Sequence, residues 1–283
     1  MSDFEIFKAP KSSVFRKVAL GSWWTAGDPS VYGILEIEMS EALRFLEEQN
    51  QSHSTKLTVT HLVGWALAET LKSRPEVNSV LRWGQIYRRS NVDLFFQVNI
   101  PGHGPERTGQ ATLSGTLIRR VDQKSLHQFA EELNEKTSRT KSGQDLEFGK
   151  TFRTLSLVPQ PLMKWVLLLS SFLNYDLKLP LHLLGVPTDP FGSAMITNVG
   201  ALAGQEAGVD VAFAPLVPYT RCPLLLAVGS VQKRPWVRND TVVVAPVLRI
   251  GVTFDHRLMD GVHATEMVQI FKSRMSNPRS FLK

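Results

Sequence analysis

The sequence predicts an α+β fold in which helices flank one mixed, mostly antiparallel sheet. Three observations indicate this class. Strand-like and helix-like stretches follow one another without a regular βαβ order, and no internal repeat is found. A glycine-rich phosphate loop after a first strand is missing from the sequence. The 283 residues, 43% of them hydrophobic, are enough to bury one substantial core and argue against a chain disordered throughout.

Hydrophobic periodicity and end signals predict the elements of the first half of the chain. In residues 31–39, apolar Leu35, Ile37 and Met39 alternate with glutamates, as in a half-buried strand. Pro75 ends the second helix, because proline cannot continue a helix. The predicted elements are a strand over 31–39, a helix capped by Ser40 to about 50, a helix over 60–74, strands over 92–100 and 111–120, and a helix over 122–137.

The second half of the chain ends in a predicted hairpin and a helix. The dipeptide Asn239-Asp240 between two apolar runs favours a tight hairpin, since both residues tolerate left-handed turn conformations. Residues 1–12 are expected to form an N-terminal arm, loose or lying over a neighbour, and 13–283 to form the domain. The predicted elements are a helical segment over 155–175, strands over 193–200 and 223–231, a hairpin over 234–254, and a helix over 260–276.

The charge and the cysteine count narrow the classes of ligand. The formal net charge is +6 and the pI about 9.5, which favours anionic ligands, including phosphorylated cofactors. The basic residues are scattered and belong to no nucleic-acid motif, so nucleic-acid binding is not expected. The single Cys222 excludes an intramolecular disulfide and a zinc site of several thiolates, and its apolar neighbours predict a buried thiol. No metal site is expected.

The apolar stretch 165–186 is the candidate for a membrane segment. Asn174, Asp176, Lys178 and Pro180 interrupt it, so no membrane span is expected. Its first half is either buried or amphipathic, and packing within the molecule or against a subunit is favoured over a surface patch for a partner or membrane. The charged N-terminus lacks an apolar signal core, and a cytoplasmic protein is expected.

The block "GVTFDHRLMDG" at 251–261 holds the candidate site. His256 follows an apolar strand, and Asp260 follows it one helical turn later. Histidine titrates near neutral pH and can take a proton from a thiol or hydroxyl, so this spacing is open to an acid–base centre. The alternative is a hydrogen-bonded histidine in a turn before a helix cap. On spacing alone the turn histidine is favoured.

The same block resembles the DHRxxDG motif of the dihydrolipoyl acyltransferases of 2-oxo acid dehydrogenase complexes. Chloramphenicol acetyltransferases share the fold of their catalytic domain. The stretches "FRKVALGSWW", "KLTVTHLVGWALAETLKSRPEVNSVL", "VDQKSLHQFAEEL" and "SAMITNVG" are also similar to that domain. The resemblance covers most of residues 13–281. It implies a chloramphenicol acetyltransferase-like fold and an acyltransferase catalytic domain over 13–283, with an apolar insertion around 153–190.

This resemblance implies exchange of an acyl group between a dihydrolipoyl thioester and coenzyme A. His256 is then the general base, and Thr197 stands where the family has a serine that donates to the oxyanion. The remaining residues would shape the site: Asp260, expected to pair with Arg16; Asn198, a second donor or a turn former; Gly261; and Asp255 with Arg257, expected to support the turn. The sequence assigns no residue to the binding of coenzyme A.

The family's architecture implies a homotrimer whose site joins His256 of one chain to Thr197 of the next, and a larger cage as a further assembly. No lipoyl domain precedes the catalytic part, so the lipoyl group is expected on another chain. The stretch "QATLSGTLIRR" departs from the family pattern. Two alternatives therefore stay open: a coenzyme A-dependent acetyltransferase acting on a small hydroxyl or amine, and a non-catalytic trimeric or cage-forming scaffold.

Overall fold

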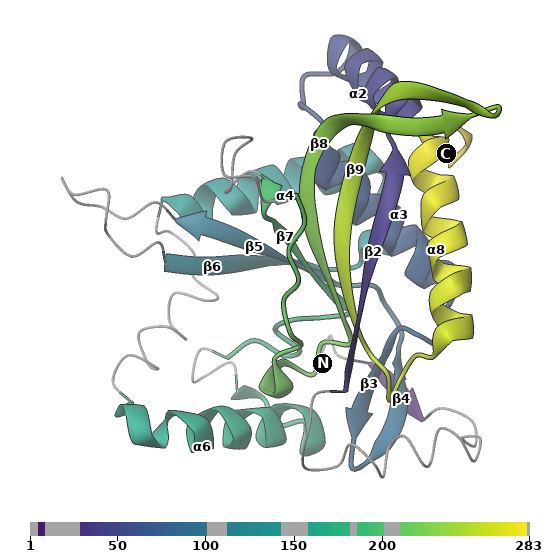
Figure 1. The fold of residues 1–283 in the computed structure, drawn as a ribbon. Helices are drawn as coiled ribbons and strands as arrows, with labels where there is room; N and C mark the ends of the chain where they lie inside the picture. Colours follow the sequence, from purple (N-terminus) through teal and green to yellow (C-terminus); the bar gives the residue numbers. More distant parts are fainter. Residues whose placement is uncertain are drawn as a thin grey trace.

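The structure is a computed structural model and describes residues 5–8, 29–100, 112–142, 158–181, 186–200 and 210–281. A six-stranded sheet forms its centre (Figure 1). The strands are β2 (Ser30–Glu38), β5 (Leu94–Ile100), β6 (Thr112–Ile118), β7 (Ala194–Asn198), β8 (Leu224–Arg238) and β9 (Thr241–Asp255).

This sheet has the order β2-β9-β8-β7-β5-β6. The strand β7 runs parallel to both neighbours, β5 and β8, and the other three pairs are antiparallel. The predicted mixed, mostly antiparallel sheet is therefore confirmed.

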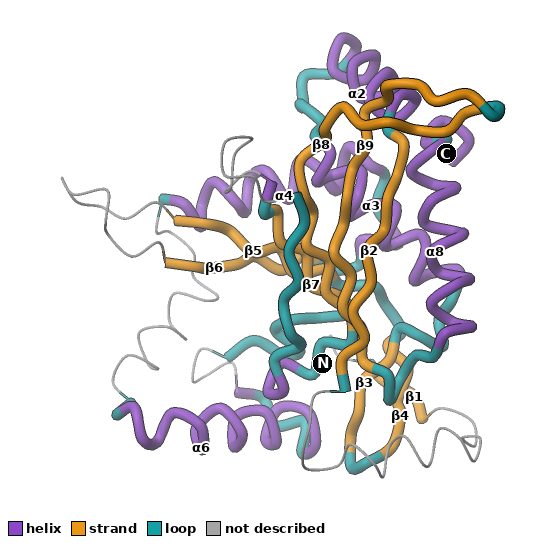
Figure 2. The backbone as a smooth tube through the Cα atoms, viewed as in Figure 1, coloured by secondary structure: helices purple, strands orange, loops and turns teal. Residues whose placement is uncertain are grey.

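Four helices pack on one face of the sheet (Figure 2). Alternate side chains of the strands meet them there, as the two-residue period of a strand requires: Leu94 and Phe96 point into this core, whereas Phe95 belongs to a smaller cluster on the other face. The helices are α2 (Ser40–Ser52), α3 (Val59–Ser73), α4 (Leu126–Lys141) and α8 (Gly261–Ser276).

The predicted hairpin is longer than expected. Asn239 and Asp240 form its turn with φ of 50° and 57°, as predicted. The strands over 223–231 and 234–238, expected to be separate, form one strand, β8, with a bulge between Val228 and Val231. The bulge lets one long strand change direction without losing its pairing with β9.

The structure contains a second, three-stranded antiparallel sheet that was not predicted from the sequence. It has the order β1-β4-β3, with β1 at Ile6–Lys8, β3 at Ser79–Arg82 and β4 at Gln85–Arg89. Its strand β1 comes from the predicted arm 1–12, whose other residues, apart from Glu5, lie outside the described part. The turn between β3 and β4 consists of Trp83 and Gly84, both at positive φ. Tryptophan is not a residue that signals such a turn.

Several helix ends differ from the prediction. Ser40 does not cap α2; the N-cap is Met39, and the Ser40 hydroxyl bonds to Glu38 instead. The helix α4 begins at Leu126 rather than 122, because Ser125 caps it through a reciprocal capping box with Gln128. The last helix agrees with the prediction over 260–276: Asp260 is the N-cap of α8.

The apolar segment 155–175 contains a surface helix, α6 (Gln160–Ser171), followed by a π-helical turn, η2 (Phe172–Asp176). Among the described residues, no helix is long and apolar enough to cross a membrane. The cytoplasmic location stays a prediction. Short 3-10 turns complete the structure: η1 (Val121–Gln123), η5 (Pro218–Thr220) and η6 (Pro278–Phe281).

Cys222 is buried, as predicted. Burial raises the pKa of its thiol to about 12, so the thiol stays protonated near neutral pH and is a poor nucleophile. The cysteine therefore serves as a small apolar residue of the core.

Candidate active site

His256 lies immediately after β9, at the end of the central strands. The last residue of β9, Asp255, pairs with Ser30 at the start of β2. The backbone N–H of His256 donates to the Pro29 carbonyl at 2.9 Å. The Nδ1 atom of the ring is buried, while the side chain as a whole is partly exposed. The ring is thus placed by paired backbone, and Nε2 is the candidate to exchange a proton with a substrate because Nδ1 is buried.

Asp255 and Arg257 hold the turn around this histidine, as expected. The guanidinium of Arg257 donates to both carboxylate oxygens of Asp255, with Nε–Oδ1 at 2.9 Å and Nη2–Oδ2 at 2.7 Å. The backbone N–H of Arg257 donates to the same carboxylate at 2.9 Å. A bidentate pair of this kind fixes direction as well as distance. Both side chains are committed to the turn rather than to chemistry.

Asp260 caps the helix that follows. Its carboxylate accepts from the backbone N–H groups of Val262 and His263, each at 3.1 Å, and lies 2.6 Å from His263 Nδ1. The two backbone bonds satisfy donors that every helix start leaves without an intrahelical partner. Arg16, the expected partner of Asp260, lies outside the described residues, so that pairing stays a prediction.

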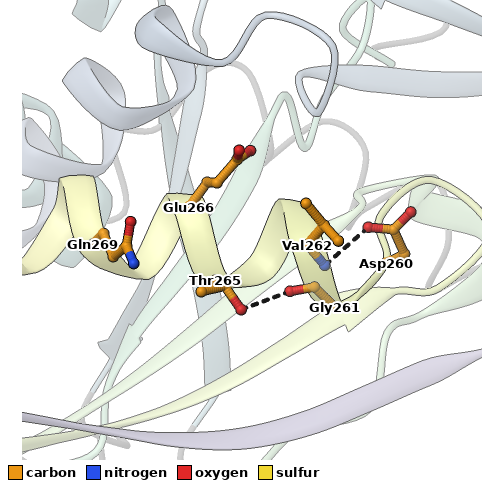
Figure 3. A pocket seen from close by; sticks show the side chains of 6 residues that line it. All are labelled: Asp260, Gly261, Val262, Thr265, Glu266 and Gln269. Carbon is orange, nitrogen blue, oxygen red and sulfur yellow. Dashed lines mark hydrogen bonds between the residues drawn. The ribbon is translucent and has the colours of Figure 1, made fainter.

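A hollow of about 580 Å³ opens beside the first turns of α8 (Figure 3). The Thr265 hydroxyl donates to the Gly261 carbonyl at 2.8 Å at its edge. A Cβ built on Gly261 would meet no atom within 4 Å, so nothing in the described chain demands glycine there. His256 is not among the described residues that line this hollow. The hollow is a broad surface depression beside the candidate base rather than its substrate pocket.

Thr197 and Asn198 end β7, which is Ala194–Asn198 within the strand predicted over 193–200. Neighbouring Ile196 points into the helical core. The Asn198 amide donates to the Thr60 hydroxyl on α3 at 2.8 Å. The alternation of a strand therefore directs the Thr197 side chain to the face away from the helices. The bond to Thr60 identifies Asn198 as a residue that ties β7 to α3.

A pocket of about 430 Å³ lies where β5 and β7 part. The pairing of these strands ends at Phe96 and Ile196, and the pocket opens beyond it. None of the described residues lining it is acidic, and Lys141 lies among them. The walls come from the sheet and the helices α3 and α4: Thr58, Thr60, His61, Phe96, Gln97, Val98, Leu133, Asn134, Thr137, Lys141, Ile196, Thr197 and Asn198.

Thr197 and His256 are far apart within one chain. Thr197 pairs with Ala227 and Ala227 with Gly251 across the sheet. His256 lies five residues beyond Gly251, which is about 17 Å along the strand, and two strand spacings add about 10 Å across. Hydrogen bonding needs about 3 Å. A single chain therefore does not bring the Thr197 hydroxyl to the His256 ring.

The pocket contains a buried histidine that the sequence analysis overlooked. His61 occupies the third position of α3, where its Nδ1 accepts from the Thr58 backbone N–H at 3.0 Å. Burial lowers the pKa of His61 to about 4, against a smaller opposing effect of its side-chain hydrogen bond with Asn134. The available signal was a capping box, Thr58 followed three residues later by a side chain able to accept a hydrogen bond.

Because His61 is neutral in the fold, stability should fall as the solution becomes acidic. The unfolded chain binds a proton near the ordinary pKa of 6.5, whereas the folded chain does so only near 4. His61 is therefore expected to lower the free energy of unfolding by about 3 kcal/mol as the pH falls from 6.5 to 4. We expect His61→Gln to remove that loss, so that the difference in unfolding free energy between wild type and variant changes with pH in this window. Denaturant titrations at pH 7 and pH 4 measure it; a difference that does not vary with pH would contradict the assignment.

Among the described residues, no group of three or more histidine, cysteine, aspartate or glutamate side chains could hold a metal ion.

Comparison with known families supports this reading of the fold. A profile described as "2-oxoacid dehydrogenases acyltransferase (catalytic domain)" matches residues 20–147 and 191–283. The match leaves out 148–190, the stretch that contains α6.

A curated relative is the dihydrolipoyllysine-residue acetyltransferase component of the pyruvate dehydrogenase complex of Zymomonas mobilis. It is 24% identical over 257 residues, which are 90% of this chain and 46% of the relative. The corresponding component of Rickettsia felis is 23% identical over 260 residues, 90% of this chain and 49% of the relative. The chain spans about half the length of these curated relatives.

Solved structures with this fold include the cubic core of the pyruvate dehydrogenase multienzyme complex. Its TM-score is 0.64 at 22% identity, with 99% of this chain and 95% of that chain covered. The dihydrolipoamide acetyltransferase of Azotobacter vinelandii has a TM-score of 0.63 at 22% identity and the same coverage. For chloramphenicol acetyltransferase the TM-score is 0.51 at 12% identity, with 99% of this chain and 100% of that chain covered.

These structures confirm the predicted chloramphenicol acetyltransferase-like fold. The family match extends over most of the sequence, including the strand that carries Thr197 and the turn that carries His256. The chain therefore belongs to the family of 2-oxoacid dehydrogenase acyltransferase catalytic domains.

Proposed function

We propose that the chain exchanges acyl groups between a dihydrolipoyl thioester and coenzyme A, with His256 as the general base. The observation that carries the proposal is the placement of this imidazole. Its backbone bonds to Pro29, its Nδ1 is buried, and the pair of Asp255 and Arg257 fixes its turn. An imidazole held this way can turn Nε2 to an incoming thiol. In the Azotobacter vinelandii acetyltransferase, a serine, a histidine and an asparagine have been investigated for their role in the catalytic mechanism, and the last two are spaced like His256 and Asp260.

The chemistry requires a thiolate. An ordinary thiol has a pKa near about 8.5, so only a few per cent is ionised at neutral pH. The Nε2 of His256 takes the proton of the coenzyme A thiol while the coenzyme A sulfur forms a bond to the thioester carbonyl carbon. The resulting tetrahedral oxyanion collapses, the bond from carbon to the lipoyl sulfur breaks, and the protonated His256 returns its proton to the departing thiolate.

The oxyanion needs a hydrogen-bond donor, and Thr197 is the candidate. Thr197 is among the residues that line the pocket between β5 and β7. A preorganised donor of this kind is worth about 3–4 kcal/mol in the transition state. The β-branch of threonine limits its rotamers. The neighbouring Asn198 helps to fix β7 through its bond to Thr60.

Such a site requires two chains, because within one chain Thr197 and His256 lie about 17 Å apart along the strands and about 10 Å apart across them. A homotrimer with each site between neighbouring subunits meets this requirement. A larger cage is the further assembly that the cubic core of a relative suggests. The lipoyl group is proposed to arrive on another chain, and no residues are assigned to the binding of coenzyme A.

Acceptor choice tests the proposal directly. The purified chain is incubated with acetyl-coenzyme A and dihydrolipoamide, and formation of the new thioester is followed. Turnover that depends on dihydrolipoamide is the expected result. Turnover only with small alcohols or amines would replace it by the acetyltransferase alternative. If no acceptor reacts and calorimetry detects no binding of coenzyme A, the chain is a scaffold.

A further inference from the structure

The helix α6 presents large apolar side chains to solvent. Trp165 is 65% exposed and Leu169 57% exposed, and no described side chain from 162 to 170 is buried. The helix lies at the lower edge of the molecule in Figure 1, where the tip of the β3–β4 hairpin also ends. We call the following exposed residues the α6 surface: Trp83, Leu162, Trp165, Leu168, Leu169 and Phe172.

Trp83 joins the hairpin tip to this surface. Its ring contacts that of Phe172 edge to face, with centroids 5.4 Å apart. Trp83 adopts a φ of 51°, which is rare for a bulky side chain. The surrounding fold therefore holds the backbone conformation that turns this tryptophan outward. The α6 surface thus has one exposed tryptophan on the hairpin, Trp83, and one on the helix, Trp165.

Hydrogen bonds to Asp176 anchor the α6 surface to the body of the protein. The Asp176 carboxylate accepts from the backbone N–H of Trp83 at 3.0 Å and from Arg221 Nη1 at 3.0 Å. Its carbonyl accepts from the Arg82 guanidinium at 2.9 Å and from the Trp83 indole at 3.1 Å. Asp176 itself is buried. The exposed apolar face thus belongs to a fixed element.

The charge around the α6 surface is positive. Lys164 is exposed, and its Nζ lies 5.7 Å from the centre of the Trp165 ring. Arg82 donates to the carbonyl of Asp176, the last residue of η2, and Lys178 follows two residues later. Burial lowers the pKa of Lys178 and the charge of Arg82 lowers it further, whereas Glu5 opposes that effect. The one carboxylate within 158–181 is Asp176, and it is paired with Arg221. A negatively charged partner is therefore favoured.

We propose that the α6 surface rests on an anionic lipid bilayer. At 12 residues, α6 is too short to span the membrane, but leucine, phenylalanine and tryptophan on one face with lysine beside them is typical of helices that lie in the interface. Contacts between protein chains are depleted in lysine, whereas a lysine lies beside the apolar side chains of this surface. The helix lies outside the family match, so the proposal does not rest on the residues proposed for acyl transfer.

Vesicle sedimentation tests the proposal with the full chain. We expect binding to vesicles of phosphatidylcholine with phosphatidylglycerol and weaker binding to phosphatidylcholine alone. Each large apolar side chain that enters the lipid should raise the partition constant by about tenfold. The double variant Trp165→Gln/Leu169→Gln should therefore lower it by about a hundredfold.

The matched control replaces two exposed valines on the β8–β9 hairpin. Val242→Gln/Val244→Gln changes side chains that are 69% and 76% exposed, and it should leave the partition constant unchanged. Three results would overturn the proposal. Two of them are wild type that stays in the supernatant with anionic vesicles, and equal losses in the two double variants. A third is self-association of the wild type without lipid that Trp165→Gln/Leu169→Gln abolishes, because the surface would then face a second copy of the chain.

Discussion

Replacing His256 with alanine is expected to lower kcat for acyl transfer between dihydrolipoamide and coenzyme A by about 10²–10⁴. Without the imidazole, the attacking thiol must lose its proton to water, and only the small fraction already present as thiolate reacts. The leaving thiolate also loses its proton donor. Steady-state rates at saturating substrate measure the effect.

The loss in the His256→Ala variant should come from chemistry and not from unfolding. The backbone bond from residue 256 to Pro29 does not involve the side chain, and the pair of Asp255 and Arg257 remains. Melting temperature and assembly should therefore match wild type. His53→Ala is the matched control, because His53 lies at the end of α2 and outside the candidate site. Unchanged turnover in His256→Ala would remove His256 from the mechanism.

Replacing Asp189 with asparagine is expected to lower the free energy of unfolding by about 3–5 kcal/mol. Asp189 and Arg89 form an ion pair with side chains only 1% and 3% exposed, at 2.8 Å. The Asp189 carboxylate also accepts from the Tyr175 hydroxyl at 2.9 Å. The substitution leaves the guanidinium buried without its counter-charge, which costs more than the lost bond alone. Urea denaturation at pH 7 measures the difference.

Asparagine is the right replacement because Asp189 has a φ of 43°, a region that asparagine tolerates and alanine does not. The control is Arg89→Met/Asp189→Asn, which removes both charges. We expect this double variant to be more stable than Asp189→Asn even though it lacks more hydrogen bonds. If it is instead less stable, the cost comes from lost packing and not from an uncompensated charge.

The sequence predicted elements whose signals are local. Asn239-Asp240 specified the hairpin turn, and Asp260 specified the start of α8, because turns and caps depend on neighbouring residues. The sheet β1-β4-β3 was missed since its strands are short and its turn uses Trp83. Pairing between residues as distant as Ile6 and Arg89 leaves no trace in a single sequence.

The candidate site was predicted only where it is continuous in the chain. The block 251–261 shows His256 and its supporting turn together, and the resemblance added Thr197. The pocket beside Thr197 could not be read from the sequence, because α3, α4, β5 and β7 meet there through tertiary packing. His61 was missed for the same reason: its capping box with Thr58 is local, but only the tertiary packing around α3 shows that this histidine is buried and therefore neutral.

Mixing two inactive variants tests the central claim that His256 of one chain works with Thr197 of another. Chains with His256→Ala are co-expressed in equal amounts with chains carrying Thr197→Val, a substitution that keeps the shape and removes the hydroxyl. In a cyclic trimer assembled at random, roughly a quarter of the sites join an intact His256 to an intact Thr197. The mixture should therefore recover roughly a quarter of wild-type turnover. Turnover no higher than that of the separate variants would place both residues in one chain or remove one of them from the site.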